Sequence, residues 1–371
     1  MPVKTISGRR ERSLHVPDAG KRGRNLIVAV LVIAAVGAVS FLLLSKKEPE
    51  NVHELPAKSA LSAWIVDWQS DAGLADLSKL KGSLASLQVF AAYFDEQGRL
   101  YYTDQMKQSL PAIREEVGSA EANGMTPALF LTIVNDRINS DGTAVQKEAA
   151  LVTELTSSAA RRAQHIDEIM SAVGSGGYDG VELDYEKIAE DDWNNVTALY
   201  RELYEKLAAD NKTLRVVLEP RAPLEKLALP EGPVYVMMAY NLYGYHSGPG
   251  PKADHAFISK LAQRMGSLPG EPFIAFSLGG FAWSDKGETT ALTETMAAGL
   301  LRSHNAEPQR DEGSGAVYFT YQDELENQHI VWYADHITVA GWMREAEKHG
   351  IDRFALWRLG EMEQSMLESF N

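Results

Sequence analysis

Short apolar runs recur along the chain from residue 60 onward, and segments with helical periodicity separate them. Parallel strands that helices cover on both faces show continuous apolar runs rather than strict alternation. The pattern predicts eight such strands, at residues 63–68, 87–94, 127–134, 178–186, 214–218, 234–240, 272–278 and 353–357. Eight strands that alternate with helix-length segments predict an α/β fold, a (β/α)8 TIM barrel, over residues 60–371. An open doubly wound sheet is the alternative, but the Gly-x-Gly-x-x-Gly turn of that fold is absent after the first strand.

The segments between the strands predict the helices. Helices are expected near residues 104–122, 144–173, 191–210 and 253–266. The gap between the seventh and eighth strands is longer than the others. Within it, residues 316–335 look like a β-hairpin beside helix-like stretches near 288–303 and 337–349. We therefore predict a small β-hairpin insertion between strands 7 and 8 of the barrel.

The first 59 residues have a different pattern. Residues 1–25 carry seven basic and two acidic side chains, residues 26–45 are apolar or small without charge, and residues 46–59 are polar. A helix of about 20 residues spans the roughly 30 Å core of a bilayer. Basic residues before such a segment keep the N-terminus in the cytoplasm.

We therefore expect a cytoplasmic tail at 1–25, a transmembrane signal-anchor helix at 26–45, a linker at 46–59 and an extracytoplasmic barrel at the cell membrane. A cleaved signal peptide is the alternative. Its apolar core is usually about 7–15 residues long and precedes a small-residue cleavage site. This core is longer and has no Ala-x-Ala pattern.

Composition narrows the classes of function. The formal net charge is -15, and residues 26–371 alone carry -20. Such an acidic body argues against binding to nucleic acid, which calls for basic surface. The chain has no cysteine, which excludes disulfides and cysteine-ligated metals, and its nine histidines show no metal-binding spacing. We expect neither a metal nor another cofactor.

Four carboxylates lie within eight residues on the predicted fourth strand, in the run Asp179-Gly180-Val181-Glu182-Leu183-Asp184-Tyr185-Glu186. Because side chains alternate along a strand, Glu182, Asp184 and Glu186 share one face, and the apolar residues between them share the other. Three like charges on one face repel one another, so chemistry is the simplest reason to keep them. A solvated edge strand with an acidic outer face is the alternative.

This acidic face suits the cleavage of glycosidic bonds. The active site of such a barrel lies at the C-terminal ends of its strands, where Glu186 stands with Asp184 one step below it. Glycosidic cleavage needs an acid that protonates the leaving oxygen and a second group that stabilises the oxocarbenium-like transition state. A glutamate near other carboxylates in a cavity gains proton affinity, so Glu186 is the candidate acid.

Three motifs resemble a known family. Asp179-Gly180-x-x-x-Asp184-x-Glu186 resembles the strand-four signature of glycoside hydrolase family 18, the chitinase-like enzymes. Met238-Ala239-Tyr240-Asn241 is similar to the family's Met-x-Tyr-Asp motif after strand six, and Trp357 falls where the family has a tryptophan on strand eight. Residues 329–333 and 355–360 resemble most the branch that contains spore-cortex-lytic and spore-germination enzymes. The resemblance covers residues 60–365.

The resemblance implies a substrate-assisted retaining mechanism, in which the 2-acetamido oxygen of the bound sugar attacks its own anomeric carbon. It implies that Glu186 is the general acid and then the base, and that Asp184 orients the acetamido N–H. It further implies that Tyr240 donates a hydrogen bond to the acetamido group and that Trp357 stacks under the sugar. The implied substrate is a polysaccharide that contains N-acetylglucosamine, with peptidoglycan or spore cortex ahead of chitin oligomers.

Two positions depart from the family pattern. Glu182 stands where the family often has Asp or Asn, and Asn241 stands where it has Asp. Both departures leave Glu186 and Asp184 in place, so activity is expected, with the rate and the substrate preference left open.

Further residues complete the candidate site. The expected additional substrate contacts are Glu182, Tyr185, Asn241 and Trp283, and the expected structural supports are Asp179 and Gly180. Other aromatic residues near strand ends either stack on sugar or fill the core, namely Trp64, Trp68, Tyr93, Tyr243 and Tyr245. Glu219 and Arg221 either line the cleft or pair with each other.

Two other functions are compatible with the sequence. One is a non-catalytic glycan-binding barrel protein of the cell envelope. The other is a barrel hydrolase that uses two carboxylates directly on sugars without a 2-acetamido group. The fold alone does not separate these functions, because this barrel hosts many chemistries.

Overall fold

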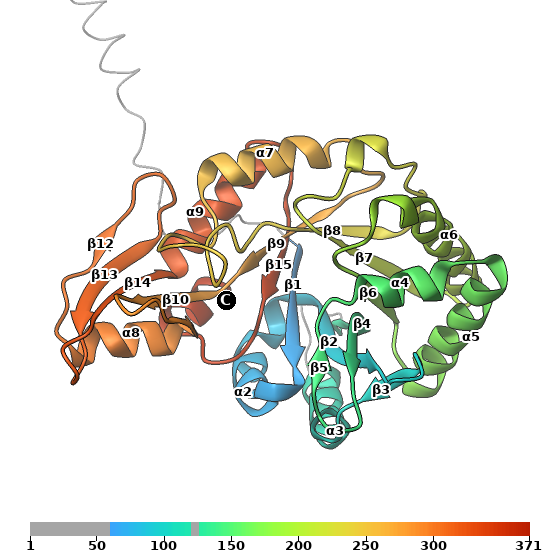
Figure 1. Cartoon of the computed structure of the whole chain (residues 1–371), viewed down its shortest axis with the longest axis horizontal. Helices are drawn as coiled ribbons and strands as arrows, with labels where there is room; N and C mark the ends of the chain where they lie inside the picture. Colours follow the sequence, from blue (N-terminus) through green and yellow to red (C-terminus); the bar gives the residue numbers. More distant parts are fainter. Residues whose placement is uncertain (1–59, 120–125) are drawn as a thin grey trace, which may run out of the picture. The chain divides into compact units, whose positions relative to one another are not determined.

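Eight parallel strands form a closed barrel (Figure 1). The computed structural model describes residues 60–119 and 126–371. The barrel strands are β1 Ala60–Val66, β2 Leu84–Phe94, β4 Ala128–Ile138, β6 Gly180–Asp184, β7 Thr213–Leu218, β8 Val234–Met238, β9 Phe273–Ser277 and β15 Arg353–Trp357. Each strand pairs in parallel with the next, and β15 pairs with β1, which closes the ring. The prediction of an eight-stranded barrel is confirmed.

The tail, anchor helix and linker predicted at 1–59 lie outside the described residues. Among the helices in the two described ranges, none combines the length and the apolar character needed to cross a membrane.

Helices cover the outside of the barrel. They are α2 Ser70–Leu80, α3 Asp104–Gly118, α4 Ala149–Thr156, α5 Ala159–Gly176, α6 Trp193–Ala209, α7 His255–Met265, α9 His336–Glu347 and α10 Gln364–Ser369. The single helix expected at 144–173 is two helices. The hydroxyl of Ser158 accepts a hydrogen bond from the Arg161 backbone N–H and caps the start of α5, which separates it from α4.

Short antiparallel strands extend two of the barrel strands at the end that carries the site. β3 Leu100–Tyr102 pairs with β2, and β5 Ala144–Val145 pairs with β4. The chain between β4 and α4 therefore folds back over the barrel rim as a short hairpin.

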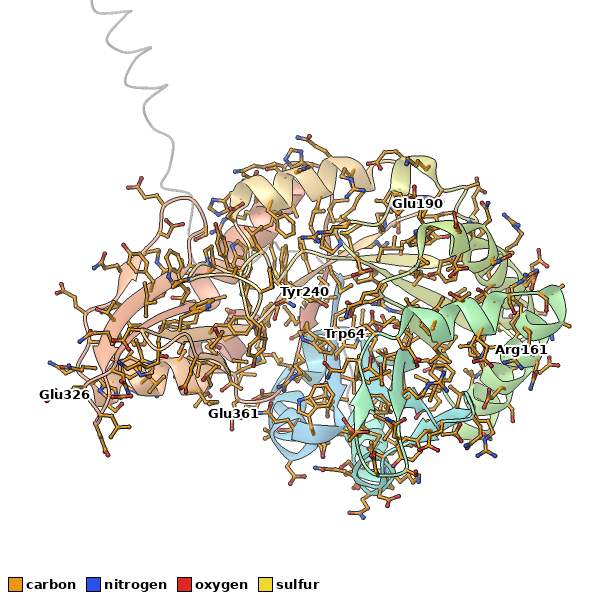
Figure 2. The ribbon with its side chains drawn as sticks, viewed as in Figure 1. Trp64, Arg161, Glu190, Tyr240, Glu326 and Glu361 are labelled. Carbon is orange, nitrogen blue, oxygen red and sulfur yellow. The ribbon has the colours of Figure 1, made fainter. Side chains whose placement is uncertain are left out.

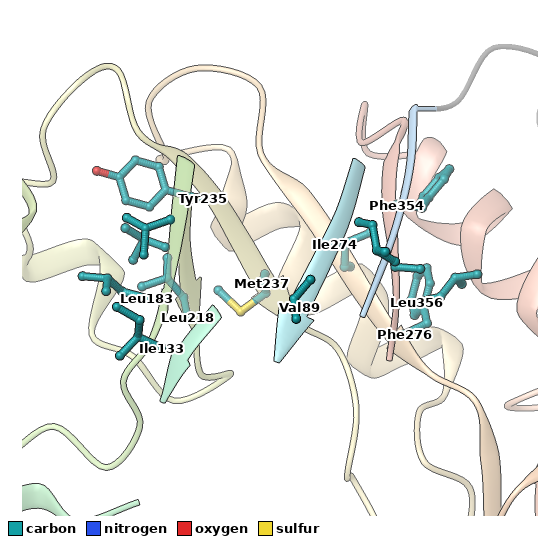
Figure 3. Packing of buried hydrophobic residues seen from close by; sticks show 14 of the residues in the cluster. Val89, Ile133, Leu183, Leu218, Tyr235, Met237, Ile274, Phe276, Phe354 and Leu356 are labelled. Carbon is teal, nitrogen blue, oxygen red and sulfur yellow. The ribbon is translucent and has the colours of Figure 1, made fainter. Parts of the chain in front are cut away.

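Two apolar layers follow from the alternation of side chains along the strands. The smaller layer contains strand residues alone, such as Trp64, Phe90 and Met238, and fills the barrel interior. The larger layer joins strand and helix residues, and Figure 3 shows part of it on the strands. The acidic face of β6 therefore belongs to the interior, and its apolar face belongs to the outer layer.

The insertion between β9 and β15 is larger than the predicted hairpin. It is a five-stranded antiparallel sheet in the order β11-β10-β14-β13-β12, and it lies beside the barrel at the left of Figure 1. Its elements are β10 Gly279–Ser284, β11 Thr289–Leu292, α8 Glu294–Ser303, β12 Gln309–Arg310, β13 Val317–Gln322 and β14 Gln328–Ala334. The predicted hairpin is present as β13 and β14. The sequence does not reveal β10, because it follows β9 after one residue and looks like its continuation. The helix-like stretch expected near 288–303 begins instead with β11, and α8 forms only its second part.

Candidate active site

The start of β6 is fixed by its neighbours. The Asp179 carboxylate accepts a hydrogen bond from the Leu129 backbone N–H at 2.8 Å, and the Asp179 carbonyl accepts one from the Thr213 N–H at 3.1 Å. A Cβ atom on Gly180 would lie 2.1 Å from the Thr213 carbonyl oxygen, so only glycine fits there. The contacts of Asp179 and Gly180 thus hold β6 against both neighbouring strands, which supports their expected structural role.

Glu182 lies at the bottom of the acidic row and is fully buried. Its carboxylate accepts hydrogen bonds from Trp64 Nε1 at 2.5 Å and from Thr132 Oγ1 at 2.9 Å. Arg215 Nε completes the set at 2.9 Å and forms a buried ion pair with it. Because these partners surround Glu182 below the cavity, the expected substrate contact of Glu182 is corrected to an internal, supporting position.

Tyr185 lies on the opposite face of the strand. It is 2% exposed, and its hydroxyl lies 2.6 Å from His165 Nε2 on α5. Burial lowers the pKa of His165 to about 3, with Arg161 adding to the effect, so its imidazole is neutral. The expected substrate contact of Tyr185 is therefore corrected, because the side chain packs in the outer layer behind β6.

Glu186 stands at the rim of the barrel, two residues after the end of β6. Its backbone N–H donates to Asn135 Oδ1, and Asn135 Nδ2 donates to its carbonyl, both at 2.9 Å. This two-way contact fixes the backbone of Glu186 against the end of β4. The Glu186 side chain is 21% exposed and lines a cavity, as the sequence predicts for a rim residue.

Asp184 lies one step deeper and is 6% exposed. Burial raises its pKa to about 7, against the attraction of Lys147 and with the help of Glu186 and Glu182. Its Oδ1 atom has no hydrogen-bond partner within the described part of the chain. A buried acceptor without a protein donor is suited to a donor supplied by a ligand.

Lys147 forms ion pairs with both Asp184 and Glu186. Its Nζ lies 2.7 Å from Glu186 Oε1 and 3.6 Å from Asp184 Oδ2. Burial alone would lower the pKa of Lys147, but the carboxylates of Asp184, Glu186 and Asp136 outweigh burial and raise it. Lys147 therefore stays charged between the two carboxylates.

Tyr240 and Trp357 pack against the apolar layer of the barrel interior. Burial raises the pKa of Tyr240 well above its usual value, and the carboxylates of Asp184 and Glu186 raise it further, so its hydroxyl keeps its proton and can donate. Trp357 ends β15, and its ring meets the rings of Trp64 at 5.7 Å and Phe90 at 5.1 Å edge to face. In Figure 2, Tyr240 and Trp64 lie near the centre of the barrel.

Two cavities meet at Asn241. The larger, of about 660 Å³, is lined by Glu186, Tyr240, Asn241 and residues of the β7 and β8 ends and of α7. The smaller, of about 280 Å³, is lined by Asn241, Trp68, Trp357, Arg358 and residues of the insertion. Asn241 is exposed and has a φ of 59°, a left-handed conformation that Asn adopts more readily than most residues. The larger cavity, which Glu186 lines, and the smaller cavity, which Trp357 lines, are both open to sugar units.

The aromatic candidates separate into two groups. Trp68, Tyr243 and Tyr245 are 52%, 36% and 69% exposed, whereas Trp64 and Tyr93 are buried. Trp68 also lines the smaller cavity, below the Arg358 guanidinium at 5.5 Å from its ring. Trp68 is therefore the exposed aromatic best placed to contact a sugar beyond Trp357.

Trp283 belongs to the insertion and not to the end of the seventh strand. It lies on β10, is 6% exposed, and donates from Nε1 to the Ser247 carbonyl at 3.1 Å. On the same loop, Lys252 Nζ donates to the Leu278 carbonyl at 2.6 Å, and burial lowers the pKa of Lys252 to about 7, with Arg358 adding to the effect. The expected substrate contact of Trp283 is corrected, because it ties the loop after β8 to the inserted sheet.

Glu219 and Arg221 both line the larger cavity. They form no ion pair with each other within the described ranges. Glu219 Oε2 instead accepts a hydrogen bond from the Lys187 backbone N–H at 2.7 Å. Of the two alternatives, the structure favours cleft lining.

The sequence does not predict three residues that contact the carboxylates of the acidic row or the backbone beside them, namely Asn135, Arg215 and Lys147. Asn135 could have been found, because it follows a predicted barrel strand at its C-terminal end. Arg215 and Lys147 offer no such signal. Arg215 is one basic residue inside an apolar strand, and Lys147 lies in a loop 39 residues before Glu186, so only the fold brings them to the carboxylates.

An eight-stranded barrel with paired carboxylates at the rim, an aromatic floor and two adjoining cavities is the arrangement of a carbohydrate-cleaving enzyme. Residues 148–361, more than half of the chain, match the family described as Glycosyl hydrolases family 18. The chain therefore belongs to this family.

Relatives of known name agree with this assignment. The Cortical fragment-lytic enzyme of Bacillus anthracis is 23% identical over 272 residues, which are 67% of this chain and 60% of that protein. The chain spans between 53% and 67% of the length of the curated relatives it matches.

Solved structures share the fold. The Bacillus cereus spore cortex-lytic enzyme SleL has a TM-score of 0.69 at 17% identity, with 84% of this chain and 73% of that chain covered. A chitinase from Chromobacterium violaceum ATCC 12472 has a TM-score of 0.69 at 18% identity, with 84% and 98% covered.

Proposed function

We propose that this protein is a glycosidase that hydrolyses β-linked polymers that contain N-acetylglucosamine, by a substrate-assisted retaining mechanism. The observation that carries the proposal is the different depth of the three carboxylates on and after β6. Glu186 lines the cavity at the rim, Asp184 lies below it with an unoccupied acceptor, and Glu182 is sealed in the interior. One carboxylate at the rim can serve as the acid, and the second is placed beneath the sugar rather than across the bond.

In the first step, the 2-acetamido oxygen attacks the anomeric carbon of its own sugar, and Glu186 donates a proton to the leaving oxygen. The acetamido N–H donates to Asp184, whose negative charge stabilises the positive oxazolinium intermediate. The Tyr240 hydroxyl donates to the acetamido group, and Trp357 supports the ring from below. In the second step, Glu186 takes a proton from water, which opens the intermediate with retention of configuration.

The wall of the larger cavity favours an acidic sugar on the leaving-group side. Arg221 follows β7, and Lys260 lies on α7. Neither has an ion-pair partner within the described residues, although the chain as a whole is strongly acidic. The neighbouring Arg264 is already held by Glu225 and by two backbone carbonyls. Two cations in the cavity that Glu186 lines, without an ion-pair partner among the described residues, suit the lactyl carboxylate of muramic acid, so peptidoglycan or spore cortex ranks ahead of chitin.

The reaction is tested with purified protein and its Glu186→Gln variant on peptidoglycan and on chitin oligosaccharides. The wild type is expected to release reducing ends and the variant to release almost none. Mass spectrometry of the products should show reducing N-acetylglucosamine if muramic acid occupies the leaving-group side. Equal activity of the two proteins would remove Glu186 from the mechanism, and binding without turnover by the wild type would favour a glycan-binding barrel.

The polymer preference has its own test. Arg221→Gln combined with Lys260→Gln is expected to lower kcat/KM on peptidoglycan more than on chitin oligosaccharides, because only the former carries carboxylates. A proportional loss on both substrates would contradict the assignment of this wall.

We further propose that residues 26–45 hold the enzyme at the cell membrane with the barrel on the outer side. The support is the charge-free apolar segment behind a basic tail. Protease protection in intact and permeabilised cells tests it. A barrel that is digested only after permeabilisation would contradict the orientation.

A further inference from the structure

Lys147 is placed by its backbone and not only by a long side chain. Its backbone N–H donates to Asp136 Oδ1 at 2.8 Å, and its φ is 54°. The next residue, Glu148, donates its N–H to the Asn135 carbonyl at 2.8 Å and pairs through its carboxylate with Arg137 Nε at 2.6 Å. Three consecutive residues at the end of β4 therefore hold the Lys147 loop over the barrel mouth.

The side-chain amide of Asn135 connects the Lys147 loop to the backbone of Glu186. Asn135 Nδ2 lies 2.9 Å from the Glu186 carbonyl and 3.3 Å from the Glu148 carbonyl. The backbones of Glu186 and of the Lys147 loop thus share one side chain. The ion pair between Lys147 and Glu186 joins two segments whose spacing the fold already fixes.

Acidic groups face Lys147 from several elements. Asp184 and Glu186 belong to β6 and its end, and Asp136 belongs to β4. Glu219, at the end of β7, also lies within the electrostatic reach of Lys147 and of Glu186. The β2 side contributes the ring of Phe90, with Nζ at 5.8 Å from its centre. Lys147 is the cation that contacts both carboxylates of the catalytic pair.

This arrangement has a chemical consequence for the proposed reaction. A general acid must carry a proton when substrate is bound. In the free protein, Glu186 Oε1 instead accepts from the Lys147 ammonium at 2.7 Å, and that contact favours the ionised carboxylate. The oxazolinium intermediate is also positive, so a cation kept beside Asp184 would oppose it.

We propose that Lys147 is a positioning residue that sets the protonation of the Asp184–Glu186 pair. It contacts both carboxyls in the empty site and withdraws from Glu186 when the sugar enters, so that Glu186 takes up a proton from solvent in the complex. This inference rests on the proposed function, because it concerns the same two carboxyls.

The first experiment measures kcat/KM against pH for the wild type and for Lys147→Met, which keeps the length of the side chain without its charge. Loss of the cation makes ionisation of both carboxyls harder. The acidic limb of the profile requires ionised Asp184, and the alkaline limb requires protonated Glu186. Both limbs should therefore move to higher pH, by about 1–3 units. Lys147→Arg should keep both limbs near their wild-type positions.

Two controls separate charge from structure. Lys147→Gln keeps a hydrogen-bond donor without the charge and should move the limbs in the same direction as Lys147→Met. Lys206→Met removes an equal charge from the outer helix α6, where Lys206 pairs with Asp167, and should leave both limbs unchanged. Limbs of Lys147→Met and Lys147→Gln that coincide with the wild type, in folded proteins, would overturn the inference.

A second measurement covers variants that fold without turnover. Binding of a thiazoline analogue of the oxazolinium intermediate, followed by tryptophan fluorescence against pH, needs no proton transfer to a leaving group. Its pH midpoint should move upward in Lys147→Met, and an unchanged midpoint would overturn the inference. If the wild type itself neither turns over substrate nor binds the analogue, the proposed function has failed instead.

Discussion

The buried ion pair between Arg215 and Glu182 gives a sharp test of how the acidic row is tolerated. The two side chains are 3% and 0% exposed, and Arg215 Nε lies 2.9 Å from Glu182 Oε2. At that separation, and with an effective dielectric constant of about 20, two unit charges attract by about 6 kcal/mol. Removal of both ions from water offsets most of this attraction, so the pair contributes little net stability while it is intact.

Loss of one partner is a different case. Arg215→Met leaves the Glu182 charge buried without a cation, and breaking a buried pair in this way costs about 3–5 kcal/mol. That is a large share of the roughly 5–15 kcal/mol that stabilises a typical protein. We expect guanidinium unfolding to show this loss. Arg302→Met is the matched control, because Arg302 is 62% exposed and lies 3.4 Å from Glu363, and it should cost less than about 1 kcal/mol.

A double variant tests the physical reason. In Glu182→Gln combined with Arg215→Met, neither of the two side chains buries a charge, and the amide oxygen still accepts from Trp64 and Thr132. The double variant should regain about 2 kcal/mol or more relative to Arg215→Met. An Arg215→Met protein no less stable than Arg302→Met would refute this reasoning, and so would a double variant less stable than Arg215→Met.

Three further predictions concern the site and its support. Tyr240→Phe removes one donor to the acetamido group and should lower kcat by about 10²-fold or more with the fold unchanged, which steady-state kinetics and thermal melting can check together. The folded-state pKa of Asp184, about 7, lies above its ordinary value of 3.8, so the folded state binds the extra proton between these values and stability falls as pH rises through them. The melting temperature of the wild type should therefore fall relative to that of Asp184→Asn from pH 4 to pH 7, and parallel curves would contradict this. His165 has a depressed folded-state pKa of about 3, so the stability linked to it is present above its ordinary pKa of 6.5 and is lost as pH falls. His165→Phe should lose less stability than the wild type between pH 6.5 and pH 4, and an equal loss would count against the neutral imidazole.

The sequence predicts the barrel well because its strands are buried on both faces. Each of the eight apolar runs overlaps an observed strand, and the last, 353–357, coincides with β15. The insertion is predicted only in part, since β10 follows β9 so closely that its apolar residues join the run of the barrel strand. Periodicity records which residues are buried, but it does not record where the chain turns from one sheet into another.

The sequence also predicts the site only in part. Glu186 and Asp184 come together because they are neighbours on one strand, so their spacing is sufficient. Tyr185 was assigned to substrate although strand alternation places it on the outer face, and the hydrogen bond to His165 corrects this assignment. Arg215 and Lys147 reach the carboxylates from other strands and loops. An ion pair between distant segments produces no periodic pattern in the sequence. For that reason the sequence predicts the carboxylates of β6 but not their cationic partners Arg215 and Lys147.

The hydrogen bonds to Glu182 also fix the register of β6. Its carboxylate on β6 contacts Thr132 on β4, Arg215 on β7 and Trp64 on β1, and the last contact crosses the lumen, because β1 is not a neighbour of β6. A slip of β6 by two residues would keep every apolar side chain on its proper face, so the hydrophobic pattern cannot forbid it. The crossing contact forbids it, because the slip would leave Arg215 and Trp64 facing a different side chain. The contacts of Glu182 thus determine the position of Glu186 at the barrel rim.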